Sequence, residues 1–257
     1  MSAPVTCVVD AGVATITLDR PDAKNRLDAE SMALLLEHLR ATAADPGVRV
    51  VVLTGSGSTF CSGADLAGAV AATSGGFASG GTSGLVDVLV AMLDHPKPII
   101  GRVQGHVAGG GNGLVAACDI VVASADARFA FSEVRVGVAP AIISVVCLQV
   151  MHRRDAQELL LTGERVSAER VRAAGLVTQV VEVGGLDAAV AAYADQLVQG
   201  GPEAVARTKE LLRRVPAMTQ EDALAWTAEV SAGLFTSAEA REGMTAFLEK
   251  RKPEWAP

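Results

Sequence analysis

The chain has 257 residues, which is long for a single domain and suggests one main core with a smaller appended element. Half of the residues are hydrophobic and 4% are aromatic, so a pocket should be lined mainly by Val, Leu, Ile and Ala. With 22 basic and 29 acidic residues the net charge is −7, which argues against nucleic acid as a partner.

The cysteines and the N-terminus exclude further classes. Cys7, Cys61, Cys118 and Cys147 are widely spaced and form no CxxC pair, which argues against a zinc cluster and a disulfide framework. No run approaches the roughly 18 apolar residues of a membrane span, and the first ten residues do not resemble a signal peptide. We therefore expect a cytoplasmic protein without a metal centre and without membrane association.

Short apolar runs predict the strands. The first two runs flank Asp10, Ala11 and Gly12 and are typical of a hairpin. Later runs alternate with helical or Gly-rich stretches, which favours a βαβ architecture. The predicted strands are residues 5–9, 13–18, 49–54, 99–103, 120–123 and 177–181.

Helical periodicity fills much of the remaining chain. Asp28 is a predicted N-cap, and apolar residues then recur at helical spacing until residues 45–47 end the helix. Residues 73–84 are rich in Gly and Ser and predict a mobile loop over or beside a site, with a plain surface insertion as the alternative. From residue 186 the pattern is helical, with a break at residues 200–202. Two pairs have capping-box spacing, Thr219 with Asp222 and Thr236 with Glu239.

Two glycine-containing segments each follow a predicted strand. In residues 60–66 (FCSGADL), Gly63 permits an unusual backbone angle that would let the amide of Ala64 face a cleft. A plain strand-to-helix turn is the alternative. In residues 105–114 (GHVAGGGNGL), three successive glycines let a ligand approach the backbone, and a helix start offers unpaired amides to negative charge. Tight helix packing would require the same glycines.

A third segment, residues 129–141 (FAFSEVRVGVAPA), places Glu133 among apolar neighbours. Desolvation there would raise the pKa of its carboxyl group toward the range that is useful for proton transfer. The alternative is a local ion pair with Arg135.

Together these segments resemble the enoyl-CoA hydratase/isomerase, or crotonase, superfamily. The likeness extends from residues 18–21 (LDRP) to residues 242–252 (EGMTAFLEKRK) and so covers nearly the whole chain. It implies an α/β fold with a repeated ββα spiral core over residues 1–199 and a helical trimerisation region over residues 200–257. The implied assembly is a homotrimer or a dimer of trimers.

The resemblance also assigns site residues. The backbone amides of Ala64 and Gly110 would hold the oxygen of an acyl-CoA thioester, and Glu133 would transfer the proton. No cofactor is implied, because the coenzyme A thioester is the substrate itself. Basic side chains near the coenzyme phosphates include Lys24 and Arg26, and a neighbouring subunit would supply two further residues. The full implied coenzyme set is Lys24, Arg26, Ala64, Asp65, Leu66, Gly110, Phe247 and Lys250. The basic members of this set are otherwise ordinary surface charges.

One position departs from the pattern of family hydratases. These enzymes commonly carry a second glutamate three residues beyond the middle glycine, where this chain has Gly113. Glu133 would then act alone in adding water to a 2-enoyl-CoA to give a 3-hydroxyacyl-CoA. The alternatives are a Δ3,Δ2-enoyl-CoA isomerase and a catalytically weak acyl-CoA-binding homologue. A dienoyl-CoA isomerase is disfavoured because Ala141 stands where such enzymes have an Asp. Arg135 either pairs with a carboxylate on the acyl chain, forms a structural ion pair or faces solvent.

Overall fold

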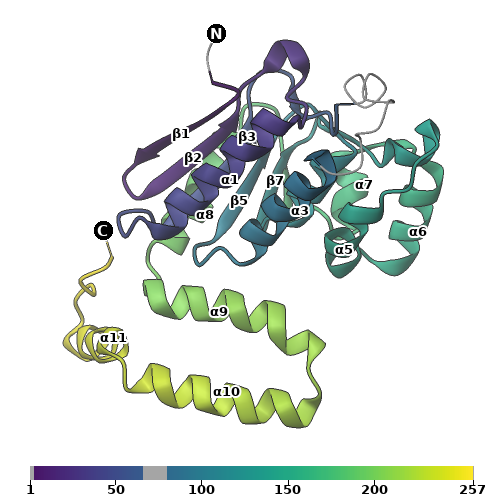
Figure 1. Ribbon diagram of the computed structural model, residues 1–257. Helices are drawn as coiled ribbons and strands as arrows, with labels where there is room; N and C mark the ends of the chain where they lie inside the picture. The colour runs from purple at the N-terminus through teal and green to yellow at the C-terminus, as the bar shows by residue number, and fades with distance from the viewer. Residues whose placement is uncertain (1–2, 66–79, 257) are drawn as a thin grey trace.

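The computed structural model describes residues 3–65 and 80–256 (Figure 1). Its strands are β1 (Val5–Asp10), β2 (Val13–Leu18), β3 (Val50–Gly55), β4 (Thr59–Cys61), β5 (Ile99–Val103), β6 (His106–Ala108), β7 (Ile120–Ser124), β8 (Arg128–Ala130), β9 (Arg165–Ser167) and β10 (Gln179–Val181). Its α-helices are α1 (Ala29–Ala44), α3 (Gly80–Leu93), α4 (Gly110–Ala116), α5 (Ala141–Val150), α6 (Arg153–Thr162), α7 (Ala168–Ala173), α8 (Leu186–Leu197), α9 (Pro202–Arg214), α10 (Gln220–Phe235) and α11 (Ala238–Glu249). Short 3-10 helices are η1 (Pro21–Ala23), η2 (Ser132–Val136) and η3 (Val215–Ala217).

The predicted hairpin and first helix are confirmed. β1 pairs with β2 in antiparallel register, and Ala11 and Gly12 between them both have positive φ, as the tightest hairpin turns require. The side chain of Asp28 accepts a hydrogen bond from the Ser31 amide at 2.9 Å and so caps α1. The hairpin and α1 therefore follow from local turn and capping chemistry.

The main sheet has the order β1-β2-β3-β5-β7-β10, and every pair after the hairpin is parallel. Figure 1 shows α1 and α3 in front of this sheet and α8 behind it. On the α8 face, Val50 and Val52 of β3 pack with Leu186 and Val190. β3 is buried along its whole length, as expected for a parallel strand that is covered on both faces. The predicted strands at 49–54, 99–103 and 120–123 are thus confirmed to within a residue, and the one predicted at 177–181 is present but begins at Gln179.

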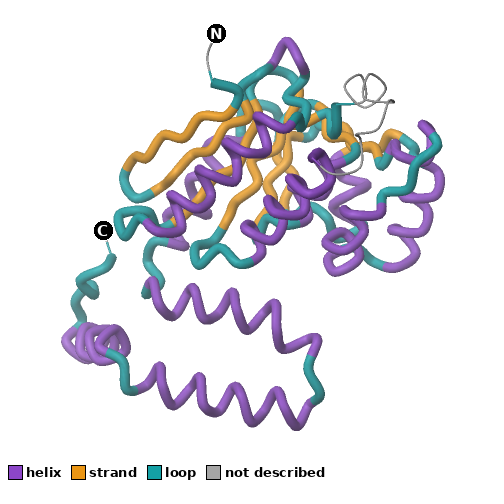
Figure 2. Tube along the Cα trace, in the orientation of Figure 1, coloured by secondary structure: helices purple, strands orange, loops and turns teal. Residues whose placement is uncertain are grey.

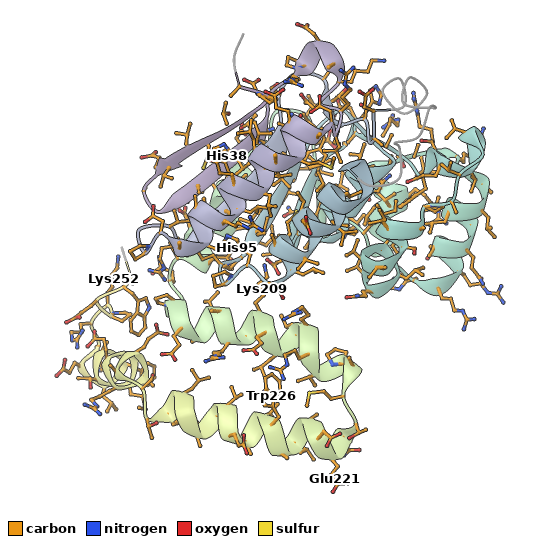
Figure 3. The ribbon with its side chains drawn as sticks, in the orientation of Figure 1. His38, His95, Lys209, Glu221, Trp226 and Lys252 are labelled. Atoms are coloured by element: carbon orange, nitrogen blue, oxygen red, sulfur yellow. The ribbon has the colours of Figure 1, made fainter. Side chains whose placement is uncertain are left out.

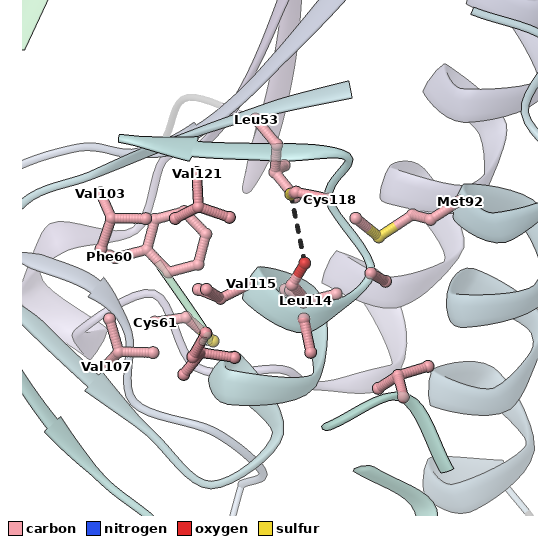
Figure 4. Packing of buried hydrophobic residues seen from close by; sticks show 14 of the residues in the cluster. Leu53, Phe60, Cys61, Met92, Val103, Val107, Leu114, Val115, Cys118 and Val121 are labelled. Carbon is pink, nitrogen blue, oxygen red and sulfur yellow. Dashed lines mark hydrogen bonds between the residues drawn. The ribbon is translucent and has the colours of Figure 1, made fainter. Parts of the chain in front are cut away.

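A second, smaller sheet has the order β4-β6-β8-β9, with β4, β6 and β8 parallel to one another. Each of its first three strands follows a strand of the main sheet, so β3–β4, β5–β6 and β7–β8 are successive pairs, and a helix follows each pair. α4, which follows the second pair, sits in the core. Figure 4 shows Leu114 and Val115 of α4 among Phe60, Cys61 and Val107. The predicted ββα repetition is present in the described residues.

The last three helices, α9 to α11, form a C-terminal arm that projects below the sheets (Figures 1 and 2). Neither α9 nor α10 contains a fully buried side chain. Lys209 of α9, labelled in Figure 3, is one of the arm's contacts with the core, and its ammonium group donates to Asp119 at 2.7 Å. Within the arm, the guanidinium of Arg214 lies 4.1 Å from the ring centroid of Trp226. Large apolar side chains of the arm remain exposed: Leu212, Leu224, Phe235, Met244, Phe247 and Leu248.

Two local predictions are corrected. The N-cap of α11 is Ser237, not Thr236, because the Ser237 hydroxyl accepts from the Ala240 amide. The carboxylate of Glu239 instead accepts from the backbone of Glu203 and Ala204 at the start of α9. This contact between two helices could not be read from local spacing. The pair at Thr219 is confirmed as a cap of α10.

The loop predicted at 73–84 is wrong in its last part, because α3 begins at Gly80 and its packing against α1 overrides the high glycine content. Residues 73–79 lie outside the described residues.

Candidate active site

The three segments singled out by sequence meet at one edge of the small sheet. Ala64 lies three residues after β4, Gly110 two residues after β6, and Glu133 three residues after β8. Because β4, β6 and β8 are adjacent and parallel, their carboxyl ends reach the same edge. Segments that are far apart in sequence are therefore placed together by the register of three short strands.

Gly63 and Ala64 form the first part of the site. The carbonyl of Gly63 accepts from the Leu27 amide at 2.8 Å, and Ala64 forms an isolated parallel bridge with Leu27. Gly63 has φ +87°, and a Cβ added there would lie 2.9 Å from the Ala108 carbonyl oxygen and 3.2 Å from the Gly110 nitrogen. Only glycine fits this close approach. The amide of Ala64 donates to no backbone acceptor within the described ranges.

The second part is the turn from β6 into α4. Gly109 is the N-cap of α4 and has φ 50° and ψ −126°, a combination that side-chain-bearing residues avoid. Its amide donates to the carbonyl of Ala130 at 3.2 Å, which fixes the turn to the end of β8. Gly110 is the first helical residue, and in the described part of the chain its amide also has no backbone acceptor. Two unpaired amides thus lie on neighbouring segments.

Glu133 is the acidic group beside these amides. Its Oε1 would lie 3.7 Å from a Cβ placed on Gly109, and its Oε2 is buried without a hydrogen-bond partner among the residues that the structure describes. Burial raises the pKa of this carboxyl group above its ordinary value, and a backbone hydrogen bond opposes the shift only in part. The protonated form of this carboxyl group is therefore favoured more than that of an ordinary, exposed glutamate.

The ion pair considered for Glu133 does not form. Arg135 instead donates from Nε to the carbonyl of Thr162 at 3.0 Å and links η2 to α6. Arg135 is exposed, and this bond gives it a structural role. The charge of Glu133 is therefore left without a cationic neighbour in the described ion pairs.

Gly113 has a packing reason that sequence reasoning missed. A Cβ at this position would lie 2.6 Å from Cγ2 of Ile143, a buried residue of α5. Glycine inside a helix costs about 1 kcal/mol relative to alanine, so its presence here needs such a reason. The space above Gly113 is filled by an aliphatic side chain from the next helix.

The expected coenzyme residues fall into two groups. Lys24 is exposed, and its carbonyl accepts from the Ser62 amide at 3.1 Å, so this segment adjoins the Gly63 turn. Nε of Arg26 lies 3.6 Å from Asp65 Oδ2 and 3.8 Å from Asp28 Oδ2. These residues are near the candidate site.

Two further residues of the expected coenzyme set, Phe247 and Lys250, lie far from the candidate site of their own chain. Phe247 is 83% exposed, and Lys250 caps the end of α11. Both belong to the C-terminal arm, which Figure 1 places at the opposite end of the molecule from η1 and the segment that follows it. Leu66 lies outside the described residues.

Asn112 and Cys147 were also missed. Asn112 is fully buried in α4. The Sγ of Cys147, in α5, donates to the backbone carbonyl of Asn112 at 3.8 Å. Burial, aided by the nearby charge of Glu133, raises the pKa of the Cys147 thiol to about 12, so the thiol stays neutral. The available signal was an amide side chain within an otherwise small and apolar helix.

Other features of the described residues lie away from this site. Two cavities of about 320 and 370 Å³ flank Pro96 near the arm, and neither is lined by Ala64, Gly110 or Glu133. Within the described ranges no group of three His, Cys, Asp or Glu side chains is placed to hold a metal ion. No described helix combines the length and the apolar character of a membrane span.

Comparison with known proteins gives matches over nearly the whole chain. The (E)-benzylidenesuccinyl-CoA hydratase of Thauera aromatica is 34% identical and aligns over 97% of this chain and 98% of its own. A carnitinyl-CoA dehydratase of Salmonella arizonae is also 34% identical, over 99% of both chains. The crystal structure of an enoyl-CoA hydratase from Mycobacterium smegmatis is similar with a TM-score of 0.94 at 38% identity and covers 100% of both chains.

The likeness to solved structures confirms the expected crotonase-like α/β fold. The sequence profile described as enoyl-CoA hydratase/isomerase matches residues 9–257. Profile, relatives and fold agree, and the chain belongs to the enoyl-CoA hydratase/isomerase family.

Proposed function

We propose that the protein catalyses the reversible addition of water to a 2-enoyl-CoA thioester, giving a 3-hydroxyacyl-CoA. The observation that carries the proposal is the position of the Glu133 carboxyl group beside Gly109, next to the unpaired amide of Gly110. The names of two relatives, a hydratase and a dehydratase of CoA thioesters, support the addition and removal of water.

In the proposed reaction the thioester oxygen lies between the amides of Ala64 and Gly110. Glu133 removes a proton from water while the water oxygen bonds to C3, and electrons move through C2 onto the thioester oxygen. The two N–H groups stabilise this enolate without reorganising, and losing one such donor typically costs about 3 kcal/mol in the barrier. The protonated Glu133 then delivers the proton to C2, which restores the carboxylate.

Burial supports this role for Glu133. A carboxyl group whose pKa is raised accepts a proton from water more readily than an ordinary carboxylate does. With Gly113 packed against Ile143, no second carboxylate can occupy that position, so a single group serves as base and acid.

Glu133→Gln tests the proposal, since it keeps the size of the side chain and removes its acid–base function. Turnover of crotonyl-CoA, followed as loss of the conjugated absorbance, should fall by at least about 100-fold. Glu37→Gln, on the exposed face of α1, is the matched control and should retain full turnover. Near-normal activity of a folded Glu133→Gln protein would contradict the assignment.

The alternative is a Δ3,Δ2-enoyl-CoA isomerase, which the single carboxylate also favours because one base can move a proton between C2 and C4. A 3-enoyl-CoA would then gain conjugated absorbance, whereas crotonyl-CoA would be left unchanged. Binding of the thioester without turnover of either compound would instead indicate an acyl-CoA-binding homologue.

We further propose a homotrimer or a dimer of trimers, in which Phe247 and Lys250 reach the coenzyme bound to a neighbouring subunit. Residues 200–257, the predicted trimerisation region, would form the contacts. The exposed apolar side chains of the arm support this, because a monomer would leave them in water. Leu224→Asp should lower the mass measured by light scattering, and an unchanged mass would argue against the arm as the interface.

A further inference from the structure

Asn112 is a fully buried polar side chain in the first turn of α4, and the reaction described above does not use it. Its Nδ2 donates to the carbonyl of Ala130 at 2.9 Å and to that of Gly109 at 3.3 Å. Its Oδ1 is buried and has no hydrogen-bond partner among the described residues. The contribution of this side chain therefore comes from its two N–H donors.

The two acceptors belong to the two segments that carry the candidate chemistry. Ala130 ends β8, and the backbone continues from it into η2 and Glu133. Gly109 is the N-cap of α4 and directly precedes Gly110. The amide of Gly109 also donates to the carbonyl of Ala130, at 3.2 Å. The Asn112 carboxamide thus closes a small hydrogen-bonded ring that joins both segments.

The glycine turn needs such an external tie. Residues 109–111 are all glycine and have no side chains that could hold the backbone by packing. Glycine also has access to more backbone conformations than any other residue, so hydrogen bonds that anchor the turn to β8 help to fix the direction of the Gly110 N–H, beside the packing of the turn against Gly63 and Cys61. The bonds from Asn112 and Gly109 to Ala130 supply this restraint.

We propose that Asn112 is a positioning residue that fixes the Gly110 amide relative to the Glu133 carboxyl group. The proposal rests on the proposed function, because it matters for turnover only if both groups act on one substrate. A displacement of about 1 Å between a catalytic group and its substrate can cost roughly 100-fold in rate. A residue that merely filled the core would affect stability and leave turnover by the folded protein unchanged.

Two substitutions separate these roles. Asn112→Ala removes the carboxamide, and Asn112→Leu keeps nearly its size and shape while removing its donors. In both variants kcat for crotonyl-CoA should fall by about 10-fold to 100-fold, with KM changed by less than about 3-fold. The acid limb of the kcat/KM pH profile should also move, because Glu133 loses its fixed surroundings.

Thr42→Ala is the matched control. Thr42 is likewise buried, and its hydroxyl donates to the carbonyls of His38 and Leu39 at 2.8 and 3.1 Å, in α1. Its loss should lower the melting temperature while kcat stays within about 2-fold of the parent value. All assays are made at a temperature at which thermal unfolding shows every variant to be folded.

Hydrogen exchange provides a readout that does not depend on activity. Exchange of the Gly109 amide should be faster in Asn112→Leu and unchanged in Thr42→Ala. The proposal is overturned if Gly109 exchanges at the parent rate in both Asn112 variants, or if exchange accelerates while kcat in an active enzyme is unaffected. If the parent protein turns over no enoyl-CoA but Gly109 exchange still accelerates, the tie is supported and the proposed function fails.

Discussion

The candidate site and the C-terminal arm leave opposite kinds of groups without partners. In the site, the groups without a hydrogen-bond partner among the described residues are polar: the backbone amides of exposed Ala64 and buried Gly110, and Oε2 of the half-buried Glu133. In the arm, Arg251 pairs with Glu242 and Arg214 with Glu210, yet large apolar side chains such as Phe247 face solvent. Unpaired polar groups suit a small polar ligand, and uncovered apolar groups suit another protein surface. The two regions therefore differ in the kind of group that they leave uncovered.

The largest expected effect comes from disturbing the close approach at Gly63. A Cβ there would press on the Ala108 carbonyl and the Gly110 nitrogen, and φ +87° would strain any side-chain-bearing residue. In Gly63→Ala we expect the amides of Ala64 and Gly110 to move apart. Turnover should then fall by at least about 100-fold, the scale of losing one donor to an oxyanion.

Gly184→Ala separates strain from contact. Gly184 has φ +95°, and no atom lies within 4 Å of an added Cβ, so only the backbone strain is shared with Gly63. Both variants should lose about 1 kcal/mol of unfolding free energy from strain, measured by urea denaturation. Only Gly63→Ala should lose activity. Equal turnover in the two variants would show that the approach of the two segments is unimportant.

An intermediate effect on the free energy of unfolding is expected for two helical glycines, Gly113 beside the candidate site and Gly233 in the arm. The two substitutions should change it in opposite directions. Gly113→Ala must push Ile143 away and should destabilise the fold by about 1–3 kcal/mol. Gly233→Ala in α10 meets nothing within 4 Å and should stabilise it by about 0.5–1 kcal/mol, because alanine favours helix. Denaturant midpoints give both values. A stabilising Gly113→Ala would mean that α4 and α5 pack loosely.

The smallest expected effect is a gain in stability on loss of the carboxylate of Glu133. Its folded pKa is raised above the unfolded value, so the folded state binds the proton more tightly. Below the unfolded pKa the group is neutral in both states and costs nothing. As the pH rises through the folded pKa, the cost of burying the charge is incurred in full.

Glu133→Gln should therefore melt higher than the parent at pH 7, by a few degrees. The difference between the two proteins should disappear below about pH 4, where the unfolded carboxyl is protonated as well. A difference that is constant from pH 4 to pH 8 would indicate that burial does not perturb this group.

Local signals in the sequence were sufficient for much of the fold. The hairpin at Ala11 and Gly12 and the cap at Asp28 depend on neighbouring residues only, and β3 is recognisable from its continuous apolar run. The contact from Glu239 to the start of α9 depends on how two distant helices meet, so its spacing was misread as a local cap. Likewise, the glycines of α3 suggested a loop from residue 80, where packing against α1 gives a helix.

For the candidate site, the sequence motifs predicted which residues would lie close together. They did not predict which side chains pack around those residues. Ala64, Gly110 and Glu133 meet because three strands are parallel, which the ββα resemblance implied. The contact of Ile143 with Gly113 and the buried carboxamide of Asn112 involve a helix or strand that is distant in sequence. The amide side chain of Asn112 in an apolar stretch could have marked a buried polar group, but its partner on β8 and the contact of Gly113 with Ile143 depend on how the chain is folded.

Arg49, at the entrance to β3, has a practical consequence for handling the protein. Its guanidinium donates to the carbonyl of Gly200 at 2.6 Å and to that of Trp255 at 2.9 Å, so one side chain binds both the root of the arm and its returning end. The Trp255 indole in turn donates to the Gln199 carbonyl at 3.1 Å. An affinity tag fused after Pro257 would begin three positions beyond Trp255, so a fusion before residue 1 is the safer choice for purification.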